Sequence, residues 1–77
     1  MLISENEIEL ESLLERHLYE NGFSKVNVNI KVYSIDEVEL RVTADDKRLS
    51  ISMCNDDFDN EDHFYSYMVM VMNKYLK

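Results

Sequence analysis

The sequence predicts a single α+β domain over residues 1–77, with the order helix, three antiparallel strands, helix. Two apolar periodicities lead to this prediction. Apolar residues recur at helical spacing near each end of the chain, and three stretches between them alternate apolar and polar residues, as strands with one buried face do. With 45% hydrophobic and 31% charged residues, the 77-residue chain has the composition of one globular domain with a modest core.

The first helix is expected over about residues 5–21. Ser4 and Glu7 have the spacing of a capping box, and Ile3 and Ile8 occupy the two positions of a hydrophobic staple. The apolar face that follows is formed by Leu10, Leu13, Leu14, His17 and Leu18. This spacing predicts a helix that packs one face against the rest of the domain.

Three alternating stretches predict the sheet. Their apolar positions are Val26, Val28, Ile30 and Val32, then Val38, Leu40, Val42 and Ala44, then Leu49, Ile51 and Met53. The connections near residues 34–36 and 45–47 are short, which requires neighbouring strands to be antiparallel. We therefore expect a three-stranded meander, with both helices packed on its apolar face and its polar face in water.

The last helix is expected over residues 61–77, after a polar loop at residues 55–60. Its core stripe should be Phe64, Tyr67, Met68, Val71 and Tyr75. A second apolar strip beside it comprises Tyr65, Val69, Met72 and Leu76. Packing of this strip against the first helix predicts a monomer, whereas contact with a second copy predicts a homodimer, and both remain open.

No pattern indicates a catalytic site, a cofactor or a metal. The chain has one glycine and no proline, whereas phosphate-binding loops and nucleophile elbows need several glycines. The stretch beginning at Asp57 is similar to the start of a calcium loop, but Asp62 replaces the glycine that such a loop needs. His17, His63 and Cys54 lack the spacing of a zinc site. We expect a non-enzymatic protein without cofactors.

The charge of the chain restricts its partners. Sixteen acidic residues against eight basic ones give a formal charge of −8, so phosphate backbones and anionic membranes repel it. A basic protein surface is the partner that such a chain attracts. No apolar run approaches the length of about 20 residues that a membrane span needs. The single cysteine, and a start that lacks the features of an export signal, lead us to expect a cytoplasmic protein.

The predicted topology gathers the acidic residues toward one end. Twelve of the sixteen belong to the first helix start, the first hairpin and the approach to the last helix: Glu5, Glu7, Glu9, Glu11, Asp36, Glu37, Glu39, Asp56, Asp57, Asp59, Glu61 and Asp62. Lys25, Lys47, Arg48, Lys74 and Lys77 fall toward the other end. Helix dipoles favour this polarity, but the five acids within residues 56–62 also repel one another. Solubility and partner binding are both open interpretations of the acidic end.

A partner-binding surface is expected at this end. Its residues are Asp36, Glu37, Glu39, Asp56, Asp57, Phe58, Asp59, Glu61, Asp62 and Tyr65. The carboxylates would supply charge, and Phe58 and Tyr65 would anchor the contact, because aromatic side chains concentrate binding energy in polar interfaces.

The order of elements resembles that of the double-stranded RNA-binding domain. Members of that family bind RNA partly through a basic start to their last helix. In this chain the corresponding position carries Asp59, Glu61 and Asp62. The resemblance therefore implies a similar fold and does not imply RNA binding.

The segment from Asp56 to Tyr65, together with the order of elements, resembles small acidic anti-CRISPR proteins of phage that block the type II RNA-guided nuclease. In that family such acids occupy the site where the nuclease reads DNA. The resemblance implies an inhibitor that mimics phosphates and acts in the host cytoplasm. Other phage-coded nucleic-acid mimics have the same features. The alternatives are an immunity or adaptor protein for a basic partner, and a small assembly subunit.

Overall fold

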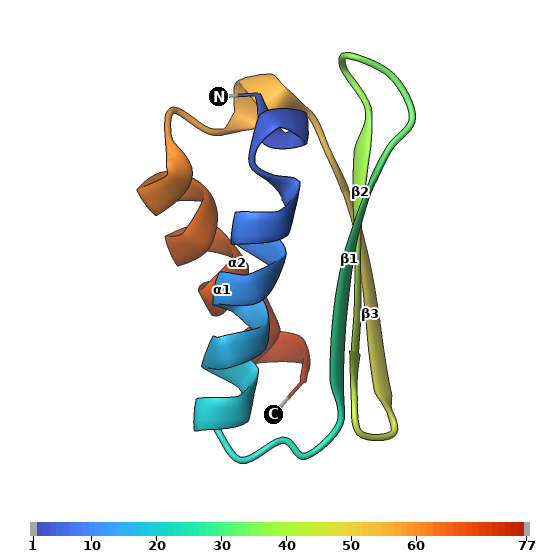
Figure 1. The fold of residues 1–77 in the computed structure, drawn as a ribbon, viewed down its shortest axis with the longest axis vertical. Coiled ribbons are helices and arrows are strands. Elements are labelled where there is room, and N and C mark those ends of the chain that lie inside the picture. The colour runs from blue at the N-terminus through green and yellow to red at the C-terminus, as the bar shows by residue number, and fades with distance from the viewer. Residues whose placement is uncertain (1, 77) are drawn as a thin grey trace.

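The computed structural model describes residues 2–76, apart from the side chain of Ser4. It contains the 3-10 turn η1 (Ile3–Glu5), helix α1 (Glu7–Glu20), strands β1 (Val26–Val32), β2 (Val38–Ala44) and β3 (Lys47–Met53), the 3-10 turn η2 (Asn55–Asp57) and helix α2 (Glu61–Tyr75). The strands form one antiparallel sheet in the order β1-β2-β3, and both helices lie on the same side of it (Figure 1). The predicted α-β-β-β-α meander is confirmed.

The register turns one face of the sheet toward the helices. Leu40 of β2 pairs with Ile30 of β1 and with Ile51 of β3. Leu40 and Ile30 are buried, and Ile51 is half-buried. The polar residues that the alternation places in water are exposed: Lys25, Asn27, Asn29, Lys31, Arg41, Ser50 and Ser52. The sheet therefore has one buried and one wet face, as the alternation predicted, and β3 is its least covered strand.

The start of α1 differs from the predicted capping box. The helix begins at Glu7 with Asn6 as its N-cap residue, while Ser4 belongs to η1 and its side chain lies outside the described part of the chain. Ile3 is fully buried and Ile8 is 81% exposed, so the two residues do not form a hydrophobic staple. The prediction of the staple was wrong because the chain folds Ile3 into the core rather than along α1.

The buried face of α2 is rotated away from the predicted core stripe. Phe64 and Met68 are fully buried as expected, but Tyr67 is 41% exposed and Tyr75 is 60% exposed. The two tyrosines lie on the side of the helix that faces β3, together with Met70 and Val71. The stripe that the sequence predicts is therefore only partly covered in one chain.

The second apolar strip of α2 packs within the same chain. Met72 and Leu76 are buried, and Tyr65 and Val69 are half-buried against the core. The ring of Tyr65 lies edge-on to His17 of α1, with 6.2 Å between the ring centroids. This confirms the expected packing of the strip against the first helix, so this strip itself is not available to a second copy. Neither helix of residues 2–76 is long and apolar enough to cross a membrane.

The edge of β1 is closed by two carboxylates from α1. The main-chain N–H of Ile30 donates to Glu11 Oε2 at 2.7 Å, and that of Val28 donates to Glu15 Oε1 at 3.2 Å. These are the groups that another strand would use to pair with this edge. Glu11 was expected among the acids of one end, but its carboxylate bonds to the edge of the sheet instead.

The two isoleucines of the predicted staple provide a matched test of the N-terminal fold. Ile3→Ala should lower the free energy of unfolding by about 2–5 kcal/mol, because it empties a buried site. Ile8→Ala should change it by less than about 0.5 kcal/mol, because the side chain lies in water. Urea unfolding followed by circular dichroism measures both. Equal losses at the two positions would show that η1 does not pack as described.

Candidate partner-binding site

Asn55 joins three segments at one end of the molecule. Its side-chain Oδ1 accepts a hydrogen bond from the N–H of Ile3 at 2.9 Å, and its Nδ2 donates to the carbonyl of Ile35 at 2.6 Å. At 8% exposure it is the only buried polar residue among residues 2–3 and 5–76, and both of its amide groups have partners. The turn η1, the β1–β2 loop and η2 are thereby held together, at the top of Figure 1.

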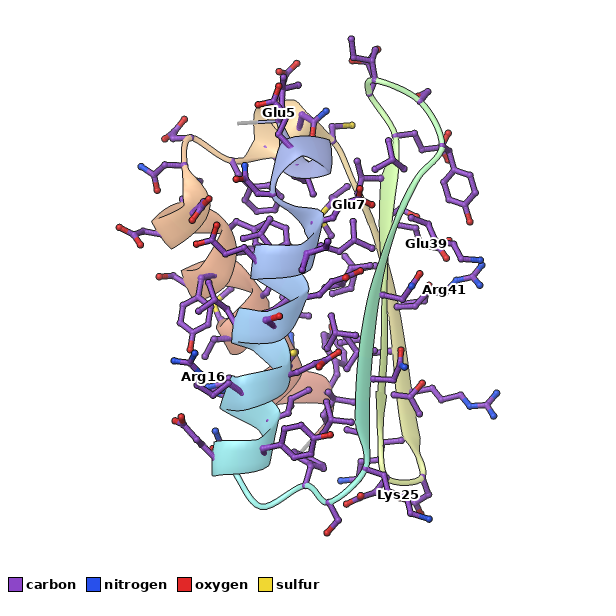
Figure 2. The ribbon with its side chains drawn as sticks, in the orientation of Figure 1. Glu5, Glu7, Arg16, Lys25, Glu39 and Arg41 are labelled. Carbon is purple, nitrogen blue, oxygen red and sulfur yellow. The ribbon has the colours of Figure 1, made fainter. Side chains whose placement is uncertain are left out.

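These segments and the start of α2 form what we call the acidic end. It carries Glu5, Asp36, Glu37, Asp56, Asp57, Asp59, Glu61 and Asp62. Figure 2 shows Glu5 at this end and Lys25 at the opposite one. Within residues 2–76, the side chains of Asp36, Asp56 and Asp62 are exposed and form no hydrogen bond or ion pair. Their carboxylates are accessible to a partner.

Two residues of this end, Asp57 and Asp59, form hydrogen bonds within the loop that carries them. Asp57 Oδ2 accepts a hydrogen bond from the N–H of Cys54 at 2.9 Å and so caps η2. The N–H of Asp59 donates to His63 Nδ1 at 3.2 Å, and the Asp59 carboxylate lies 3.9 Å from the same nitrogen. Asn60 accepts from the N–H of His63 at 2.9 Å and caps α2. Substitution of Asp57 would therefore alter the loop as well as the charge, whereas the hydrogen bond of Asp59 comes from its main chain.

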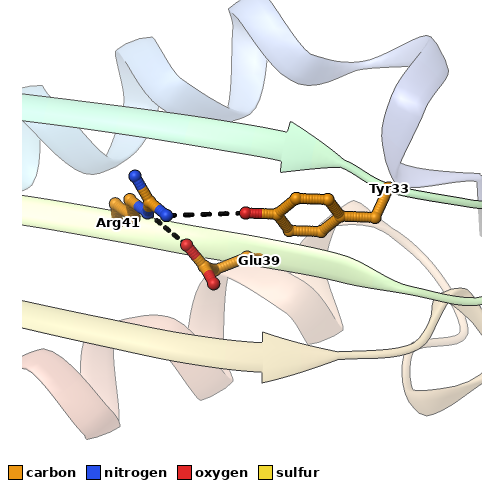
Figure 3. Close-up of polar contacts among 3 residues, drawn as sticks. All are labelled: Tyr33, Glu39 and Arg41. Carbon is orange, nitrogen blue, oxygen red and sulfur yellow. Dashed lines mark hydrogen bonds and ion pairs between the residues drawn. The ribbon is translucent and has the colours of Figure 1, made fainter.

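Glu39 lies on the outer face of the sheet and is paired there. Its carboxylate accepts from Arg41 Nε, and the guanidinium lies 3.5 Å from the hydroxyl of Tyr33 (Figure 3). Lys31 stands directly opposite Glu39 in the register. The hydrogen bond and charge of Glu39 raise the pKa of Arg41, which keeps the guanidinium charged. Glu39 thus adds little to the negative field of the acidic end.

The two expected aromatic anchors have other positions. Phe58 is 4% exposed and packs edge-on against Phe64, with 5.0 Å between the ring centroids. Tyr65 is half-buried beside His17 of α1. Phe58 is therefore a core residue and is not accessible as an anchor, and Tyr65 is accessible only in part. The contact surface of the acidic end is consequently polar.

The opposite end carries cations that stabilise the fold. Lys47 Nζ donates to the carbonyl of Leu76 at the C-terminus of α2, at 2.7 Å. Lys74 lies 5.3 Å from the ring centroid of Tyr75 in the last turn of α2. Cations at this position complement the helix dipole. The predicted position of Lys77 lies outside the described residues.

The remaining chemistry of the surface is sparse. Residues 2–76 contain no group of three or more His, Cys, Asp or Glu side chains that could hold a metal ion. A hollow of about 350 Å³ opens between β3 and the start of α2 and is lined partly by Asp57 and His63. In this hollow Asp57 Oδ2 accepts from the N–H of Cys54, and His63 Nδ1 accepts from the N–H of Asp59.

The role of Asn55 is testable by unfolding. Asn55→Ala leaves the buried N–H of Ile3 without its acceptor and should lower the free energy of unfolding by about 1–3 kcal/mol. Asn29→Ala on the wet face of the sheet is the control and should cost less than about 0.5 kcal/mol. Urea unfolding of both variants makes the comparison. A loss no larger at Asn55 than at Asn29 would mean that the three segments are held by other contacts.

Comparison with protein-family models, with curated proteins and with solved structures finds no match for this chain. Function is therefore argued from the arrangement of its own side chains. That arrangement is an acidic end in which three segments meet at Asn55.

Proposed function

We propose that this chain is a non-enzymatic inhibitor whose acidic end binds the basic groove of a nucleic-acid-binding enzyme. The observation that carries the proposal is the junction at Asn55, because it fixes acid-bearing segments from three parts of the chain. Segments held in place lose little main-chain conformational freedom on binding, which favours affinity. Asp36 and Asp56 supply negative charge that no side chain of residues 2–76 neutralises.

The acidic end carries more charge than the helix dipoles need. Two acids already lie in the first turn of each helix: Glu7 and Glu9 in α1, and Glu61 and Asp62 in α2. Asp36 and Glu37 belong to the β1–β2 loop and complement no helix. Like charges at one end repel one another and destabilise the fold. This excess supports a binding role over solubility alone.

A type II RNA-guided nuclease is the first target to test, because the segment from Asp56 to Tyr65 resembles that of small phage anti-CRISPR proteins. Such an inhibitor would act in the cytoplasm of the phage host. Its carboxylates would occupy positions that DNA phosphates take on the nuclease. Electrostatic steering would make association fast and sensitive to salt.

An immunity or adaptor protein for a basic partner is the second candidate. It is favoured by the gathering of the acids at one end of the molecule, since phosphate mimicry works best with carboxylates spaced along a ridge. Glu39, which would extend such a ridge along the sheet, is paired with Arg41. The two candidates differ in whether nucleic acid competes with the chain for its partner.

The acidic end can be tested with two matched double variants. Asp36→Asn with Asp56→Asn removes two exposed, unpaired charges and should slow association with the guide-loaded nuclease, with little change in dissociation. Glu20→Gln with Asp46→Asn removes two exposed charges at the opposite end and should have no comparable effect. Association rates at several salt concentrations, with inhibition of DNA cleavage, measure this. Wild-type affinity should fall with salt, because the screening length is about 8 Å at physiological ionic strength.

The outcomes separate the candidates. If both double variants bind as wild type does, the acidic end is not the contact surface. Simultaneous binding of DNA and this chain to the nuclease excludes phosphate mimicry and leaves the adaptor candidate. No binding to the nuclease at all excludes that target class, and a salt-eluted partner captured from a host lysate would then replace it.

A further inference from the structure

The outer edge of β3 carries main-chain groups that point away from the sheet. In an antiparallel ladder, residues bonded to the neighbouring strand alternate with residues whose N–H and C=O face outward. The N–H groups of Val28 and Ile30 face outward, because they bond to side chains of α1. The residues of β2 that pair with Val28 and Ile30 therefore bond to β3, and so do their own partners in β3. The residues of β3 that alternate with these partners are Arg48, Ser50 and Ser52, so their main-chain N–H and C=O groups point outward.

The two sheet edges are therefore unlike each other. Glu11 and Glu15 close the edge of β1, but no side chain of residues 2–76 bonds to the main chain of Arg48, Ser50 or Ser52. The edge of β3 also has no proline, which proteins commonly use to prevent pairing with another strand. An edge in this state is competent to pair with a further strand.

An apolar groove of about 570 Å³ runs beside this edge, between β3 and α2. Its apolar lining comprises Leu49, Ile51, Tyr67, Met70, Val71 and Tyr75. Met70 and Tyr75 are each 60% exposed, and together with Tyr67, which is 41% exposed, they form an exposed stripe of α2 along the groove. A stripe of this kind beside an open strand edge is typical of an interface.

We propose that a second copy of this chain occupies the groove. β3 of one copy would pair antiparallel with β3 of the other around a two-fold axis at Ser50, which joins the two sheets into one. Leu49 of each copy would then lie opposite Ile51 of the second copy. The exposed stripes of the two α2 helices would meet above these residues, and each would bury the other.

The charges along the groove favour a copy of the same chain as its occupant. β3 begins at the basic end with Lys47 and Arg48. It runs to the acidic end, where Asp56 and Asp57 follow it. Antiparallel pairing reverses one copy, so the basic start of each strand lies beside the acidic finish of the other. Lys74 in the groove likewise turns toward the acidic start of the second α2.

Self-association also compensates for the small size of the domain. A 77-residue chain has a modest core, and its third strand leaves Leu49 and Ile51 half-buried. Pairing through β3 would enclose both. The proposal goes beyond the function argued above and does not rest on it, because Asp36 and Asp62 lie outside the groove.

The position of the axis can be tested by disulfide formation. In a Cys54→Ser background, Ser50→Cys should link two chains, because facing residues of a bonded antiparallel pair have Cα atoms about 5.5 Å apart. Ser52→Cys is the matched control, since its two Cα atoms would lie about 14 Å apart, with an offset of four residues at about 3.3 Å per residue along the strands. Under mild oxidation, non-reducing gels should show linked dimer forming at least about tenfold faster from Ser50→Cys.

The stripe on α2 can be tested by sedimentation equilibrium. The wild-type chain should show a concentration-dependent dimer. Met70→Lys places a charge in the interface and should raise the dimer dissociation constant by about tenfold or more. Ile8→Lys makes the same kind of change at an exposed residue of α1 and should leave it unaltered. Ser50→Pro should also weaken the dimer, because it removes an outward N–H and no hydrogen bond inside the sheet.

Three results would overturn the proposal. They are a wild-type chain that stays monomeric across the concentration series, equal effects of Met70→Lys and Ile8→Lys, and equal rates of linking at residues 50 and 52. Circular dichroism shows whether each variant is folded, and Met70→Lys keeps the test decisive if Ser50→Pro does not fold. A monomeric chain whose groove takes a strand from another protein would count against a second copy. These results are obtained without the nuclease and with variants outside the acidic end, so the two proposals can fail separately.

Discussion

The arrangement of the acidic end depends on the two hydrogen bonds of one buried side chain, that of Asn55. A primary amide has an acceptor and a donor at fixed geometry, so it can bridge a free main-chain N–H and a free carbonyl. In this fold those groups belong to Ile3 and Ile35, which lie 52 and 20 residues away along the chain. The carboxylates nearby repel one another, and the bridge holds their segments together against that repulsion.

The acidic residues of this chain have different structural roles. Glu11 and Glu15 bond to the edge of β1, and Asp45, with a φ of 55°, accepts the N–H groups of Ser24 and Lys25 at the β2–β3 turn. The carboxylates of these acids accept main-chain hydrogen bonds, so their presence is explained by the fold without a partner. The net charge of −8 therefore includes acids whose carboxylates are already bonded within the fold. The carboxylates left accessible are those at the acidic end with no bond inside the described part of the chain.

Periodic segments could be predicted from the sequence, whereas irregular ones could not. Alternation gave the bounds of β1 and β2, because a strand with one buried face must change polarity at every residue. Asn55 and Phe58 were assigned to a polar loop, although both are buried. Their burial follows from a turn that folds back onto the core, and such a turn produces no periodic pattern in the sequence. The convergence of acids at one end followed from topology, but the pairing of Glu39 with Arg41 depends on side-chain geometry.

Zero-length carbodiimide coupling, mapped by mass spectrometry, tests the binding role of the acidic end most directly. The reagent joins a carboxylate to a lysine only where the two groups touch, so it reports which acids meet the basic groove of the guide-loaded nuclease. We expect coupling at Asp36, Asp56 and Asp62, and little at Glu20 or Asp46 on the opposite end. Coupling concentrated at Glu20 and Asp46 would contradict the assignment of the acidic end as the surface that binds the partner.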